Sequence, residues 1–110
     1  MESILTSIKK LLGIEEEYTH FDPEIIMHIN SVFTILKQLG VGPPEGFSIE
    51  DETSVWTDFL PDTHSIELVK SYMHKKVQLL FDPPTGSAHL QSVKDTASEF
   101  EWRINVEAES

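Results

Sequence analysis

The chain has 110 residues, which is enough for one domain with a buried hydrophobic core. It carries 8 basic and 19 acidic residues, and its net charge of −11 disfavours nucleic-acid phosphates and anionic membranes as binding surfaces. The sequence contains no cysteine, which excludes disulfides, thiolate zinc sites and cysteine nucleophiles.

The first apolar stripe predicts a short helix over about residues 2–12. Its side chains recur at helical spacing, and Gly13 is a typical C-terminal stop. Lys9 and Lys10 fall outside the stripe, so we expect both to face solvent. The stripe consists of Ile4, Leu5, Ile8, Leu11 and Leu12.

A second helix is predicted over about residues 23–39. Asp22 can cap its first amides, and Pro23 suits the first helical turn. Phe21 lies just before the cap and Ile26 lies four positions inside the helix, which is the spacing of a hydrophobic staple. These features together indicate a strong helix start.

Between residues 41 and 62 the helical period is lost, and we call this segment the arm. Glycine and proline dominate its first part, and one helical turn is expected around residues 55–60. Phe47, Trp56 and Phe59 need a place to be buried. They either form a lid over the core or contact another protein, and the lid is the simpler interpretation.

A third helix over about residues 65–81 has two apolar stripes. Two stripes require two packed neighbours, so we place this helix at the centre of the bundle. Its lysines are interpreted as a solvated face. One stripe consists of Ile66, Val69, Met73, Val77 and Leu80, and the other consists of Leu68, Tyr72 and Leu79.

The last helix is predicted over about residues 86–105, after a sharp proline turn. Trp102 and Val106 lie on the side opposite its core-facing seam, where they serve a contact between subunits or are covered by the chain's own tail or first helix. The predicted fold is therefore all-α, a four-helix bundle-like single domain with an irregular arm. The seam consists of Leu90, Val93, Ala97, Phe100 and Ile104.

The residue pattern predicts no catalytic, cofactor or metal site. The five histidines show no metal-binding spacing, and the acidic run at residues 50–52 lacks the alternating ligands and glycine of a calcium loop. The glycines form no phosphate-binding loop, and no serine lies in a nucleophile motif. An enzyme has no positive support, and we expect a non-enzymatic protein.

Three segments carry a resemblance to a known family: residues 72–84, with the sequence YMHKKVQLLFDPP, residues 99–105, with the sequence EFEWRIN, and residues 25–43. They resemble phage head-tail connector proteins, the adaptor family that forms a ring beneath the portal of tailed phages. The resemblance covers most of the chain.

The resemblance implies an all-helical protein at the virion head-tail interface, made in the host cytoplasm during assembly. It also implies a homo-oligomeric ring of about 12 subunits around the DNA channel, with the portal protein and a stopper or tail-completion protein as partners. In such proteins the chain ends and long loops make the contacts, which here points to residues 105–110 and 41–60. The candidate interface residues are Phe47, Trp56, Phe59, Trp102 and Val106.

The alternative function is a small acidic phage-encoded inhibitor that imitates DNA and occupies a host protein. Its support is the size and the charge of the chain. A mimic should present carboxylates in regular rows on helices, whereas many acidic residues here fall in predicted loops, at 15–17 and 50–52.

Overall fold

The computed structural model describes residues 2–60 and 65–109. The described residues form five helices and no strand, which confirms the all-α prediction. The arm contains one helical turn, as expected, and its residues 61 and 62 lie outside the described part. The helices are α1 (Ile4–Leu11), α2 (Asp22–Gln38), α3 (Trp56–Phe59), α4 (Ser65–Phe81) and α5 (Ser87–Glu109).

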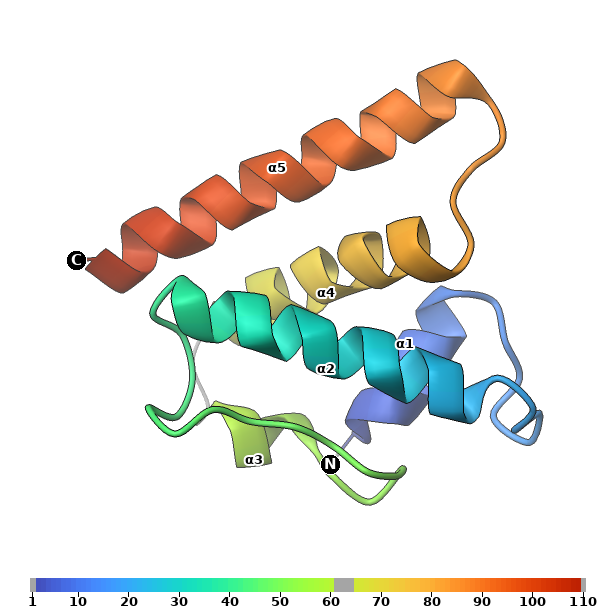
Figure 1. Ribbon diagram of the computed structural model, residues 1–110, viewed down its shortest axis with the longest axis horizontal. Coiled ribbons are helices and arrows are strands. Elements are labelled where there is room, and N and C mark those ends of the chain that lie inside the picture. Colours follow the sequence, from blue (N-terminus) through green and yellow to red (C-terminus); the bar gives the residue numbers. More distant parts are fainter. Residues whose placement is uncertain (1, 61–64, 110) are drawn as a thin grey trace.

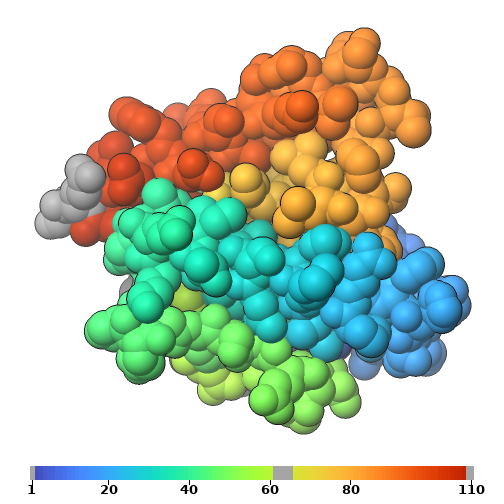
Figure 2. All heavy atoms as spheres, in the orientation of Figure 1, coloured from blue at the N-terminus to red at the C-terminus, as the bar shows by residue number. Residues whose placement is uncertain are grey.

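Helix α4 occupies the centre of the molecule, as its two apolar stripes predicted. It packs against α1, α2 and α5, and α5 runs along one side as the longest helix (Figure 1). In Figure 2, α2 crosses the face toward the viewer between α5 and the arm. The molecule is flat, with principal extents of 36 × 34 × 20 Å.

The core is built from the predicted apolar stripes of the four longer helices. The phenol of Tyr72 on α4 donates a 2.6 Å hydrogen bond to Oε2 of Glu101 on α5, which joins the two helices at their contact. Leu11 and Leu80 are exceptions to the predicted stripes, because both are exposed at the ends of α1 and α4. Fully buried members include Ile4, Ile8, Ile25, Ile29, Val32, Leu36, Met73 and Val77.

Lys9 is buried, and the prediction that it faces solvent was wrong. Its side chain is 2% exposed, because the loop after α1 folds back over it. Its ammonium donates to the backbone oxygens of Glu16 and Tyr18, at 3.0 and 2.8 Å, and lies 2.9 Å from Oδ1 of Asp22. The three acceptors compensate the cost of burying the charge.

Asp22 also differs from its predicted role as a cap. It is the first residue of α2, the residue before it makes no side-chain capping bond, and its carboxylate is used by Lys9 instead. Pro23 lies in the first turn, as predicted. The start of α2 is therefore anchored to α1 through an ion pair.

The arm is attached to the helices by polar contacts that the sequence pattern did not indicate. The side-chain amide of Asn30 on α2 donates to the Ile49 carbonyl at 3.0 Å and accepts from the Ile49 amide at 2.8 Å. The Ile4 amide donates to the Ser54 carbonyl at 3.0 Å. The side chain of Asn30 thus supplies a partner for both backbone polar groups of the buried Ile49.

Candidate assembly surfaces

The aromatic side chains of the arm lie against the core and form a lid. Trp56 and Phe59 are 4% and 3% exposed, and Phe47 is half-buried. The ring of Phe33 on α2 lies 5.0 Å from that of Phe47 and 4.6 Å from that of Phe59. The indole of Trp56 donates a 2.9 Å hydrogen bond to the Ser7 hydroxyl.

This burial favours the lid for Trp56 and Phe59, and an interface role for these two residues and for Phe47 stays a prediction. A partner cannot reach Trp56 or Phe59 while the arm covers the core, and Phe47 is held by the same cluster of rings. The sequence cannot distinguish a lid from an interface here, because both uses require the same apolar side chains.

Gly42 allows the arm to pass close to this cluster. Its φ is +94°, and a Cβ atom at this position would lie 2.4 Å from Cε1 of Phe59. Both the backbone conformation and the space require glycine at this position. The tight turn thus positions Phe59 over the core.

Trp102 and Val106 lie on the outer side of α5. They are 64% and 43% exposed, whereas Val93, Ala97 and Ile104 of the seam are buried. Helix α5 continues to Glu109 instead of ending near residue 105, so the described tail does not fold back over the indole. The alternative in which the tail or the first helix covers Trp102 is therefore wrong for the described residues.

The same outer stripe of α5 continues toward its N-terminal half with acidic residues. Asp95 and Glu99 precede Trp102 and Val106 at intervals of four, three and four residues, which keeps all four on one side of the helix. Glu99 is paired with Arg103, whose Nη2 lies 2.9 Å away, and Asp95 accepts a 2.8 Å hydrogen bond from Gln91. We call these four residues the ridge.

On the other side of α5, a cavity of about 530 Å³ opens between α1, α4 and α5. We call it the groove. Its lining contains Lys10, Lys70 and Lys75 and the acidic Glu2 and Glu67, together with the exposed side chain of Leu11 and the half-buried ring of Phe100. Lys10 and the lysines of α4 were predicted to be solvated on two different helices, and only the packing of the helices brings them together.

The groove keeps its positive charge through Lys10 and Lys75. Lys70 lies 3.5 Å from carboxylate oxygens of Glu2 and Glu67, whereas neither of the other two lysines makes an ion pair within the described residues. Burial lowers the pKa of His74, which also lines the groove, and the nearby charge of Lys75 lowers that pKa further.

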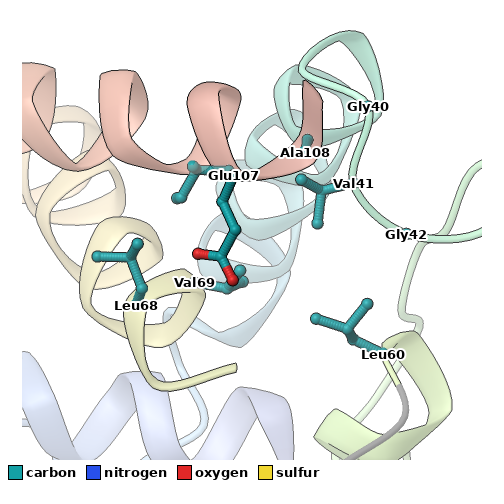
Figure 3. A pocket seen from close by; sticks show the side chains of 9 residues that line it. Gly40, Val41, Gly42, Leu60, Leu68, Val69, Glu107 and Ala108 are labelled. Atoms are coloured by element: carbon teal, nitrogen blue, oxygen red, sulfur yellow. The ribbon is translucent and has the colours of Figure 1, made fainter. Parts of the chain in front are cut away.

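A smaller cavity of about 260 Å³ lies where the ends of the arm meet the end of α5. Figure 3 shows the Glu107 side chain pointing from α5 into this space, with Leu60, Leu68 and Val69 around it. Gly40 to Gly42 and Ala108 complete the rim. The structure thus brings together the two segments that the resemblance identified as contact regions.

Within residues 2–60 and 65–109, no three histidine, cysteine or acidic residues are grouped so that they could hold a metal ion. No helix there is long and apolar enough to span a bilayer.

The geometry is that of a small helical protein with a ridge, a groove and a closed core. The sequence profile of a family described as phage connector protein matches residues 4–110. The chain belongs to this family. Comparisons with curated proteins and with solved structures give no match.

Membership in the connector family indicates a structural role in phage assembly at the junction of head and tail. It gives no support to the alternative of a DNA-mimicking inhibitor. Interaction with portal and tail proteins of the virion follows from the same family assignment.

Proposed function

We propose that this connector protein is a head-tail adaptor whose copies form a ring beneath the portal, around the channel through which DNA passes. The observation that carries this proposal is the exposure of Trp102 on the side of α5 opposite the core. A large indole in water is costly, and its burial against another subunit would stabilise an assembly.

The charge of the chain supports a place beside DNA without binding to it. A net charge of −11 repels phosphates, so a ring of such subunits would let DNA slide through its channel. Because the repulsion acts between neighbouring subunits as well, the apolar contacts at their interfaces must outweigh it.

The cavity at the end of the molecule is the contact region we assign to the portal. Its two sides, Val41 and Gly42 with Leu60 and the last turn of α5, belong to the segments that the family resemblance indicated. An Ala108→Arg variant, which changes an exposed residue on the rim, should weaken portal binding while leaving self-association of the adaptor unchanged.

Native mass spectrometry of the purified chain, alone and with its cognate portal, tests the proposal. We expect a portal complex that contains multiple copies of the chain. The Trp102→Ala variant should retain its helix content as a monomer and lose most of this assembly, because its indole is not part of the core. A wild-type chain that remains monomeric and never binds the portal would contradict the proposed function.

A further inference from the structure

The ridge and the groove lie on opposite sides of α5. Phe100 lines the groove, and Trp102 follows it by two residues, so the two side chains point about 200° apart around the helix. A surface that meets its own copy about a two-fold axis would have to be complementary to itself. Two different surfaces on opposite sides of one subunit instead suit a head-to-tail contact that repeats around a ring.

The two surfaces are also complementary in charge and apolar character. The ridge carries the carboxylate of Asp95, which has no cationic partner within the described residues, next to the exposed indole of Trp102. The groove carries Lys10 and Lys75 next to Leu11, whose side chain is 50% exposed. Acidic side chains thus adjoin the apolar centre of the ridge, and basic side chains adjoin the apolar centre of the groove. An apolar centre with charged surroundings of complementary sign is the usual arrangement of a specific interface.

We propose that the ridge of one subunit docks in the groove of the next copy of this chain. Trp102 enters the groove beside Leu11 and Phe100, and Asp95 faces Lys75 or Lys10. This inference rests on the proposed function, because it identifies the surfaces that would close the ring. The groove gathers three of the chain's 8 basic residues, of which Lys10 and Lys75 make no ion pair within the described residues, and a second copy presents the acidic and aromatic surface that matches them.

The absence of cysteine from the chain permits a clean cross-linking test. Asp95→Cys places a thiol on the ridge, and Lys75→Cys places one in the groove. Each variant and their equal mixture are assembled with the cognate portal and treated with a short bis-maleimide. We expect covalent dimers of the adaptor in the mixture, and few or none with either variant alone.

Each other outcome of this experiment has a defined meaning. Dimers of Asp95→Cys alone would show that ridge meets ridge, and cross-links from Lys75→Cys to a cysteine of the portal would show that the portal occupies the groove. Either result, or the absence of cross-links from an assembled ring, would overturn the ridge-groove contact and leave the proposed function standing. If the wild-type chain forms no multimer with the portal, both proposals are wrong.

Charge reversal provides a second, independent readout in the absence of cross-linker. Lys75→Glu and Asp95→Lys should each weaken self-association about tenfold, because each places like charges across the contact. An equal mixture of the two variants should restore assembly, since every contact between unlike subunits then joins opposite charges. Lys37→Glu, a control at an exposed position of α2 with the same change in charge as Lys75→Glu, should assemble like the wild-type chain. Failure of the mixture to recover would contradict the pairing.

Discussion

The ammonium of Lys9 lies 2.9 Å from the carboxylate of Asp22, and this ion pair joins the end of α1 to the first turn of α2. Lys9 is almost fully buried and also donates to two backbone carbonyls of the intervening loop. Removing one member of a buried pair leaves its partner's charge without compensation, and such changes are usually strongly destabilising.

The first prediction concerns this pair. Lys9→Met keeps the apolar stem but removes the ammonium, and it should lower the free energy of unfolding by about 3 kcal/mol. Urea denaturation followed by circular dichroism measures the loss. Lys10→Met is the matched control on the adjacent exposed residue, and it should change stability by no more than about 0.5 kcal/mol. Equal effects of the two variants would show that the ion pair is not structural.

The second prediction concerns the attachment of the arm through Asn30. Asn30→Ala removes two hydrogen bonds to Ile49 and should cost about 2 kcal/mol, because the backbone groups of a buried residue lose their partners. Hydrogen exchange at the Ile49 amide should be faster in this variant than in the wild-type chain. Ser31→Ala, which removes only an exposed hydroxyl bonded to the Met27 carbonyl, is the control. An unchanged exchange rate at Ile49 would refute this role for Asn30.

The third prediction compares two glycines that both have positive φ. Gly42→Ala combines an unfavourable backbone conformation with a Cβ atom 2.4 Å from the Phe59 ring, and Gly13→Ala has φ of +81° with nothing within 4 Å. The Gly13 variant should lose about 1 kcal/mol from the backbone alone, and the Gly42 variant about 3 kcal/mol. Thermal unfolding of both variants gives the comparison, and similar losses would mean that Phe59 moves aside at little cost.

The fourth prediction concerns pH. The pKa of His74 in the folded chain is lowered from its ordinary value of 6.5, first by burial and then by the charge of Lys75, while a hydrogen bond to the Leu11 backbone acts in the opposite direction. Above pH 6.5 the neutral imidazole is favoured in both the folded and the unfolded chain. As the pH falls below this value, the unfolded chain binds the proton more readily than the folded chain. Protonation therefore favours the unfolded chain, and stability is lost.

The His74→Gln variant should therefore show a smaller loss of stability between about pH 7 and pH 5 than the wild-type chain. Urea denaturation midpoints across this range measure the difference. His20→Gln, at an exposed position in the loop after α1, serves as the control for removal of a histidine. A pH dependence identical in wild type and the His74 variant would show that burial of this ring does not influence folding.

The periodic features of the sequence predicted the helices because each apolar stripe is a local pattern. The two stripes of α4 indicated its central place, and the seam of α5 identified Trp102 as lying on the opposite side. The end of α5 was placed too early, at about residue 105 instead of Glu109, because the stripe ends there while no helix-stopping residue follows.

The features that sequence reasoning missed depend on contacts between distant segments. Lys9 lies outside the apolar stripe of its own helix, and only the returning loop supplies the carbonyls that bury it. The groove likewise needs residues from three helices, and the spacing of Lys10 relative to Lys70 and Lys75 carries no signal of it. Local periodicity relates charged residues only within a single helix.

Burial of the outer side of α5 on assembly can be measured directly at Trp102. A Trp56→Phe variant leaves Trp102 as the sole tryptophan, and its fluorescence can be measured in the free chain and in the assembled portal complex with a soluble quencher. We predict that Trp102 is readily quenched in the free chain and strongly shielded, with blue-shifted emission, in the complex. Equal quenching in the two states would contradict it.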